Sequence, residues 1–467
     1  MSSTNTATDH DFSLCHVADE HKRGFGSMFV VMMGFTFFSA SMWAGGTLGA
    51  GLSFKEFLLA VLAGNLILGV YTSLLALIAS RTGLSVHLLS RYSFGEKGSY
   101  IPSAVLALTQ IGWFGVGVAM FAIPTAAAVM DIPSLQGTWL LSGSTIGISF
   151  DKIAIPARLL CLIVVLSGML MTSSAYFGIK ALAIISFIAV PAIAVFGGYS
   201  AYQALFTDPV SAGFKNGFDL ILQHTPAPGK ELTLAAAVTI AIGSFISGGT
   251  CTPDFTRFST SPKVAVSTTA LAFFLGNSMM FFFGAAGCMV YGQSDISLVL
   301  KLQGLLVPAI VVLGLNIWTT NDNALYTSGL GLSNITKIPK RKLVIVNGLV
   351  GTLASIWLYD NFCGWLNFLN TIIPPVGAIL ITDFFIVNKA VYPKLADKIF
   401  EQVNLPAVIA WASGSFVALV GAGKIPAVHS EFLAKGLPAI NGMVVAFVVY
   451  LALKRLCGCQ GKCGCGK

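Results

Sequence analysis

Six polar residues lie almost consecutively between two apolar runs of this chain: Asn316, Thr319, Thr320, Asn321, Asp322 and Asn323. The flanking runs, Leu305–Leu315 and Ala324 onward, place this block at membrane depth. There each polar group needs a partner, and an ionisable one costs about 2.5–3.5 kcal/mol on insertion scales. Asn316, Thr320 and Asn323 fall at i, i+4 and i+7, so their oxygens line one face of a helix. This pattern predicts the core helix of a transporter that binds a polar solute.

The composition is that of a polytopic membrane protein. Of the 467 residues, 55% are hydrophobic and 10% are charged, whereas a soluble domain carries about 25% charged residues. Apolar runs of spanning length recur along the whole chain, so the fold class we expect is an all-α polytopic membrane protein. Twelve transmembrane helices are predicted, at 27–47, 56–80, 101–130, 155–176, 179–205, 233–251, 264–291, 303–328, 342–358, 363–388, 403–422 and 437–454.

The positions of Lys and Arg predict the orientation. With the N-terminus in the cytoplasm, most of the 27 Lys and Arg residues fall in segments on the inner side. Both termini are therefore expected to be cytoplasmic. The same distribution accounts for the formal net charge of +8 without nucleic acid as a partner. The first 24 residues are polar and precede a full-length span, so we expect a retained first helix in a bacterial inner membrane or equivalent plasma membrane.

Two matched irregularities indicate an internal repeat. The first span contains Phe37-Phe38-Ser39-Ala40-Ser41, and the sixth contains Phe245-Ile246-Ser247-Gly248-Gly249, followed a few residues later by Pro253. Small residues weaken a helix and Pro prevents its ordinary continuation, so each stretch predicts a broken helix with free backbone groups. Helix packing through small residues is the alternative interpretation. Five spans separate the two starts, which makes the halves inverted. The predicted division is 1–24 cytoplasmic tail, 25–206 first inverted repeat, 207–232 external loop, 233–388 second inverted repeat, 389–454 two further helices and 455–467 Cys-rich cytoplasmic tail.

The third span contributes the residues of a pocket. Gln110 offers an amide that can donate and accept, and Trp113 offers a flat apolar face one turn away. Together with Phe245 from the sixth span, Trp113 predicts a stacking slot for a planar ring. For either aromatic alone, packing against lipid or core is the competing interpretation.

Three stretches of this sequence resemble the nucleobase–cation symporter-1 family, in particular its cytosine-transporting members: Gly34–Trp43, Thr109–Gly117 and Asn316–Tyr326. The resemblance runs from about residue 25 to 388, and more weakly to 454. It implies a LeuT-type fold, with a 5+5 inverted repeat and two C-terminal helices, and import of cytosine in symport with sodium. It also implies a single functional chain that works in the lipid bilayer without a further cofactor.

The resemblance also assigns residues to the two solutes. Sodium would lie between the first and eighth helices, held by the backbone carbonyls of Gly34, Phe37 and Asn316 and the hydroxyls of Thr319 and Thr320. Cytosine would lie between Trp113 and Phe245, with Gln110, Ser244, Asn321 and Phe38 completing its site. Two features depart from the family pattern: the long stretches 132–154 and 207–232, and the Cys-rich tail. These lie outside the expected pocket.

Several alternatives stay open at this level. The substrate could be another planar heterocycle, such as uracil, a purine, allantoin or a hydantoin. Asp322 could relay protons and replace sodium as the driving ion, or it could be an acid that pairs with a polar neighbour to pack two helices. A channel or a non-transporting receptor is the alternative from another class. An enzyme is not expected, because no nucleophile–base pair, metal-ligand cluster or ATP-binding loop is evident.

Eight of the nine cysteines fall into two sets. Cys161, Cys251, Cys288 and Cys363 occur singly in or near spans and are expected to pack there. Four more lie within nine residues of the C-terminal tail: Cys457, Cys459, Cys463 and Cys465. Their spacing differs from the usual zinc-binding pairs, so a metal site, lipidation and a dispensable tail all remain open.

Overall fold

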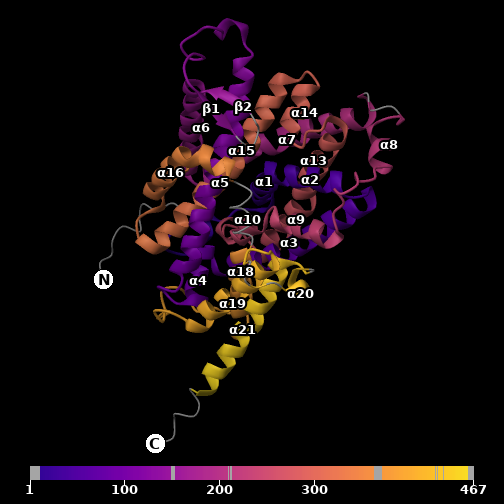
Figure 1. Ribbon diagram of the computed structural model, residues 1–467. Coiled ribbons are helices and arrows are strands. Elements are labelled where there is room, and N and C mark those ends of the chain that lie inside the picture. Colours follow the sequence, from indigo (N-terminus) through magenta and orange to yellow (C-terminus); the bar gives the residue numbers. More distant parts are fainter. Residues whose placement is uncertain are drawn as a thin grey trace, which may run out of the picture.

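A computed structural model of the protein describes residues 11–148, 153–208, 210, 213–361, 371–425, 428, 430–434 and 436–460. The regular structure in these residues is almost entirely helical (Figure 1). The exception among them is an antiparallel hairpin of β1 (Thr145–Ile148) and β2 (Ile153–Pro156). This hairpin lies in the long stretch 132–154 that the sequence marked as unusual. Cys363, Cys463 and Cys465 lie outside the described residues.

Seven helical segments of the described chain are long and apolar enough to cross a membrane: α3 (Phe54–Thr82), α5 (Tyr100–Met130), α6 (Ala157–Phe177), α7 (Ile179–Phe206), Pro262–Leu302, α16 (Lys340–Asp360) and Pro438–Leu456 of α21 (Pro438–Gln460). Two bent helix pairs raise the number to nine. α15 (Leu306–Thr336) has 31 residues but carries the polar block. Pro374–Val387, which includes α18 (Pro374–Thr382), and α19 (Leu405–Gly421) are shorter apolar helices. Because the predicted span 363–388 begins outside the described residues, the count of twelve stays a prediction.

The remaining elements are short. The segment Pro262–Leu302 consists of α12 (Pro262–Leu271), a π-helix (η4, Ala272–Asn277), α13 (Ser278–Tyr291) and α14 (Ile296–Leu302). A second π-helix, η5, covers Asp383–Val387. Outside the long helices lie α4 (Val86–Phe94), α8 (Gly217–Leu222), α20 (Glu431–Ala434) and the 3-10 turns η2 (Asp19–His21) and η3 (Pro133–Leu135).

Both predicted broken helices are present. α1 (Phe25–Thr36) and α2 (Ser39–Gly51) form the first pair, with a bend of 55°. The second pair joins α9 (Leu234–Gly243) to Ile246–Thr256, with a bend of 52°. This latter segment comprises α10 (Ile246–Thr250) and α11 (Pro253–Thr256). The two pairs support the inverted-repeat architecture.

Both breaks fall inside the predicted stretches, at their aromatic residues rather than at Ser, Gly or Pro. The chain leaves helical geometry at Phe37 and Phe38, where ψ is 91° and 131°, and at Phe245, where φ is −137°. The serines and glycines lie in the helices that follow the breaks. Pro253 begins α11, a position where its missing N–H costs no helical hydrogen bond. Tertiary packing of the aromatic residues, rather than weak local propensity, therefore sets where each helix ends.

The helices form two groups that meet at the breaks. In the first, which we call the α15 group, α5, α6, α15 and α16 pack on one another. In the second, the broken-helix group, α1, α2, α3, α9, α12 and α13 pack on one another. α1 also contacts α15, which brings the first break against the polar helix.

A chain of hydrogen bonds, buried except at its Ser278 end, joins α2, the π-helix η4, α3 and α13. Ser41 donates to Asn277 Oδ1 at 2.6 Å, and Asn277 Nδ2 donates to Asn65 Oδ1 at 2.7 Å. Asn65 Nδ2 then donates to Ser278 Oγ at 2.8 Å. Lipid offers no substitute partners, so this chain ties α2 to α3 and to the π-helix.

Gly45 allows the backbones of α2 and α13 to touch, since a Cβ there would lie 2.6 Å from Phe281 Cα. We expect Gly45→Ala to lower the melting temperature of the detergent-solubilised protein, because overpacking costs about 1–3 kcal/mol. Gly26→Ala in α1 is the control, since nothing lies within 4 Å of a Cβ at that position. Equal melting temperatures for the two variants would contradict the close contact.

Candidate functional site

A small cavity of about 30 Å³ lies where the two breaks face α5 and α15. It is lined by Phe35, Phe38, Gln110, Trp113, Ser244, Phe245, Ser247, Gly248, Thr320, Asn321 and Ala324. The structure thus brings together all six side chains that the sequence assigned to a substrate. Their role in binding stays a prediction.

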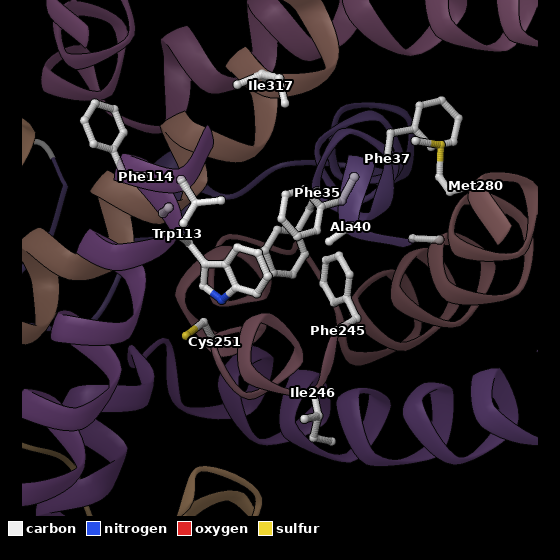
Figure 2. Packing of buried hydrophobic residues seen from close by; sticks show 14 of the residues in the cluster. Phe35, Phe37, Ala40, Trp113, Phe114, Phe245, Ile246, Cys251, Met280 and Ile317 are labelled. Carbon is white, nitrogen blue, oxygen red and sulfur yellow. The ribbon is translucent and has the colours of Figure 1, made fainter. Parts of the chain in front are cut away.

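Aromatic rings form most of the cavity wall. Phe38 meets the Trp113 indole edge-to-face, with ring centroids 4.9 Å apart, and Phe35 meets Phe245 in the same way at 4.9 Å. Figure 2 shows Trp113, Phe35 and Phe245 directed toward a common space. Neighbouring rings set nearly at right angles present faces as well as edges, and a planar solute can stack on a ring face.

Several polar side chains of the cavity wall make hydrogen bonds to other groups of the protein. Trp113 Nε1 donates to Ser247 Oγ at 3.2 Å, and Ser244 Oγ donates to the carbonyl of Ala241 at 2.9 Å. Asn321 Nδ2 donates to the carbonyl of Phe114 at 3.2 Å. Because a carbonyl can only accept, this contact fixes which end of the Asn321 amide faces α5.

Cys251 gives the Gln110 amide a defined orientation. The Cys251 thiol donates its single proton to the carbonyl of Ser247 at 3.6 Å, so its sulfur can only accept from Gln110 Nε2, also at 3.6 Å. Gln110 Oε1 receives no hydrogen bond from the described residues and lies at the cavity. The sequence left this orientation open. The structure leaves a carbonyl acceptor, and the second Nε2 hydrogen, available to a ligand.

The residues predicted to hold sodium lie on either side of the first break. α1 ends at Thr36, so the carbonyls of its last turn, including that of Gly34, lack helical donors and carry the negative end of the helix dipole. Across from them, Ser39 Oγ donates to Asn316 Oδ1 at 2.7 Å, which joins α2 to α15. The hydroxyls of Thr319 and Thr320 both lie over the Asn316 carbonyl, at 3.0 and 3.2 Å.

The oxygens predicted to bind sodium are all neutral, because they belong to hydroxyl and carbonyl groups. In the described part of the chain, no three His, Cys, Asp or Glu side chains are placed to hold a metal ion. A cation bound at the first break would therefore rely on neutral oxygens, which suits a hard monovalent ion in a broken-helix site. The assignment of Gly34, Phe37, Asn316, Thr319 and Thr320 to sodium stays a prediction.

Asp322 points away from the cavity and does not line it. Its Oδ1 accepts from Ser174 Oγ at 2.5 Å, and the same Ser174 oxygen accepts from Trp318 Nε1 at 2.7 Å. The contact joins α15 to α6, and Asp322 is fully buried. This geometry is that of an acid paired with a polar neighbour between two helices.

One side of the site is open and the other is closed. A second cavity of about 1000 Å³ shares Ser244 with the first and extends past Ile153 of β2 to Lys424. We call this the hairpin side. On the opposite side, which we call the closed side, Phe35 contacts Phe255 at 4.9 Å, and Phe255 contacts Tyr326 at 5.9 Å. These rings separate the cavity from the segment that precedes α1.

Sequence reasoning missed several lining residues. Ala324 lies one helical turn from Asn321 in α15, so helical spacing could have identified it. Phe35 lies in α1, on the other side of the break from Phe38, and helical spacing does not connect the two. Ser247 and Gly248 were interpreted only as helix breakers. Thr320 was assigned to the cation alone but also lines the substrate cavity. No sequence pattern indicates the contribution of Cys251, because its contact is with Gln110, 141 positions away in the chain.

Two solved transporters share this fold. A nucleobase-cation-symport-1 family transporter, solved in a closed conformation with bromovinylhydantoin bound, superposes with a TM-score of 0.75 at 19% identity and covers 95% of both chains. A sodium-coupled sialic acid symporter superposes with a TM-score of 0.63 at 13% identity, covering 94% of this chain and 93% of the other. These likenesses confirm the LeuT-type helical fold.

The sequence comparisons identify the family. The profile described as "Permease for cytosine/purines, uracil, thiamine, allantoin" matches residues 17–446. The cytosine permease of Escherichia coli O157:H7 is 48% identical over 406 residues, which cover 87% of this chain and 88% of that protein. The hydantoin permease of Microbacterium maritypicum is 23% identical over 88% of this chain and 82% of its own length. The chain belongs to this permease family, and it is a membrane transporter rather than an enzyme.

Ser174 allows a test of the contact between α6 and α15. We expect Ser174→Ala to lower the melting temperature, because it leaves Asp322 and Trp318 with unpaired buried groups at about 1–3 kcal/mol each. The adjacent Ser173 is exposed and bonds only its own helix, so Ser173→Ala is the matched control. If both variants had the same melting temperature, the hydrogen bond between Ser174 and Asp322 would have no structural role.

Proposed function

We propose that this protein is a secondary active transporter that imports cytosine in symport with sodium by alternating access. The observation that carries the proposal is the position of α15. Its Thr320 and Asn321 line the aromatic cavity, while its Asn316 accepts a hydrogen bond from Ser39 just after the first break, and the helix packs against α1. A cation held there would order one wall of the substrate cavity.

The polar groups of the cavity support cytosine as the substrate. Cytosine presents an exocyclic amine beside an unprotonated ring nitrogen, and uracil presents a carbonyl beside an N–H at the same edge. Gln110 as oriented by Cys251 offers Oε1 to an amine and an Nε2 hydrogen to a ring nitrogen. A site with that pattern leaves buried polar groups unpaired against uracil, which discriminates strongly. The relationship to proteins called cytosine permease, at 48% identity, points the same way.

The neutral oxygens at the first break support sodium as the coupling ion. Three of the proposed ligands are on α15, and Gly34 and Phe37 belong to α1 and its break, so the ion would join the α15 group to the broken-helix group. If sodium tightens cytosine binding by some factor, cytosine must tighten sodium binding by the same factor. Proton relay by Asp322 has less support, because this carboxyl group pairs with Ser174 outside the cavity.

The open and closed sides of the cavity support alternating access. In this structure the substrate cavity meets the large cavity of the hairpin side, and aromatic rings close the other side. We assign the hairpin side to the exterior and the N- and C-termini to the cytoplasm of a bacterial inner membrane. The membrane potential then contributes about 2.3 kcal/mol per charge per 100 mV to sodium entry. One chain supplies the whole cavity, so a monomer is sufficient.

A different planar heterocycle is the second candidate. Aromatic walls accept any planar ring, and the family includes a hydantoin permease that is 23% identical to this chain. Competition of cytosine binding by uracil, adenine and hydantoin separates the candidates. A ligand that competes better than unlabelled cytosine would replace it as the substrate.

The sodium assignment predicts a selective defect in Thr319→Val. Loss of one oxygen ligand to a charged group costs about 1.5–3 kcal/mol, and about 1.4 kcal/mol corresponds to a tenfold change in affinity. We therefore expect that the sodium concentration giving half-maximal stimulation of cytosine binding rises about tenfold or more. Thr336→Val, at the exposed end of α15, is the control. A wild-type sodium curve for Thr319→Val would place the ion elsewhere.

The aromatic wall predicts the effect of Trp113→Ala on affinity. Stacking of a base on an aromatic side chain is worth about 1–3 kcal/mol, so cytosine should bind roughly 5- to 150-fold more weakly at saturating sodium. Trp357→Ala removes an indole that is 67% exposed on the outside of α16 and should bind cytosine normally. Competition with radiolabelled cytosine on purified protein measures both. Unchanged affinity in Trp113→Ala would rule out the stacking wall.

A further inference from the structure

The segment that precedes α1 crosses the closed side of the molecule and is fixed there. Val17 donates its backbone N–H to the carbonyl of Gly83, after α3, at 3.0 Å. Further along, Arg23 donates to the carbonyl of Phe258 at 2.6 Å and accepts from the N–H of Thr260 at 3.0 Å. Residues 17–24 are therefore attached to the broken-helix group, around the end of α11.

The beginning of the same segment, at Asp11, is attached to the α15 group. The Asp11 carboxylate lies 2.8 Å from Lys340 Nζ at the start of α16, and their side chains are only 4% and 0% exposed. Lys340 also donates to the carbonyl of Ala175 in α6 at 3.2 Å. Asp11 packs against Gly178, which lies between α6 and α7. A Cβ added at Gly178 would lie 2.7 Å from the carboxyl carbon of Asp11. This ion pair therefore belongs to the α15 group.

Arg257 connects the two attachments. It follows α11, is completely buried, and donates to the carbonyls of Asp11 and Phe12 at 2.7 and 2.8 Å. The same guanidinium donates to the hydroxyl of Tyr326 on α15 at 2.9 Å. Tyr326 is the last ring of the aromatic layer that closes this side of the cavity. The N-terminal segment and the aromatic layer thus share one arginine.

We propose that residues 11–24 form a latch that holds the closed side of the transporter shut. The inference rests on the proposed alternating access, in which the α15 group and the broken-helix group separate on this side. Such a separation must pull the Asp11 carboxylate away from Lys340 or the Asp11 backbone carbonyl away from Arg257, because the two cations lie on different groups. A buried cation that loses its carboxylate is strongly disfavoured until water reaches it. The latch therefore favours the state seen here, which is open on the hairpin side.

The latch sets how often the closed side opens. Because the ion pair exists only while this side is closed, removing Asp11 withdraws stabilisation from one state and leaves the other unchanged. The remaining Lys340 charge, buried without its carboxylate, shifts the equilibrium further toward opening. Removal of both charges should shift it less than removal of Asp11 alone.

Accessibility of a buried thiol tests the latch without substrate or sodium. The reporter is Thr327→Cys, one residue beyond Tyr326 and 1% exposed, in a background with the native cysteines changed to serine. We expect Asp11→Ala to raise the rate of maleimide alkylation of this reporter about fivefold or more. Asp11→Ala combined with Lys340→Met should label more slowly than Asp11→Ala alone. The matched control is Asp19→Ala, because Asp19 is 94% exposed and, within the described residues, its ion pair is with nearby Lys22.

Equal alkylation rates for Asp11→Ala and Asp19→Ala would overturn the latch, as would a double variant that labels faster than Asp11→Ala. If Asp11→Ala does not fold, Asp11→Asn keeps the side-chain size and makes the same test. The wild-type reporter also separates this inference from the proposed function. If sodium does not slow alkylation of this reporter, the result counts against sodium symport. The comparison of alkylation rates between Asp11→Ala and Asp19→Ala would still test the latch.

Discussion

A polar group inside a bilayer must find its partner within the protein, and α15 brings six such side chains to membrane depth. Three of these side chains make contacts that fix a neighbouring helix. Asn316 accepts from Ser39 at the start of α2, and Asn321 donates to the backbone of α5. Asp322 accepts from α6 through Ser174. α15 therefore determines where the two groups of helices meet and where the cavity forms.

The same constraint explains the two broken helices. A helix can stop at membrane depth only if the released backbone groups face protein or a polar solute rather than lipid. Both breaks occur at aromatic residues, Phe37–Phe38 and Phe245, and both face the cavity beside α15. The rings build the apolar wall while the ended helix directs carbonyls toward the Asn316 region. One local irregularity thus supplies features suited to two chemically different solutes.

Sequence alone predicted much of this arrangement, because apolar runs, polar faces and paired irregularities are local patterns. The fold class, both broken helices and the polar face of α15 followed from them, and the family resemblance supplied residues that the structure gathers into one cavity. The two stretches that break were located, but the helix-weakening residues Ser, Gly and Pro did not indicate that the breaks fall at Phe37–Phe38 and Phe245, where ring packing decides. The orientation of Gln110 needed Cys251, which is distant in sequence. Residues 11–24, expected to be a simple cytoplasmic tail, pack against anchors such as Arg257 and Lys340, and no periodic pattern signals such contacts.

The most direct test of the account is uptake of radiolabelled cytosine into proteoliposomes that contain the purified protein, with and without an inward sodium gradient. The account predicts saturable accumulation above the external concentration, driven by sodium, increased by an interior-negative potential and suppressed by unlabelled cytosine far better than by uracil. Uptake that ignores the sodium gradient, or that uracil suppresses equally well, would contradict the coupled, amine-selective site described here.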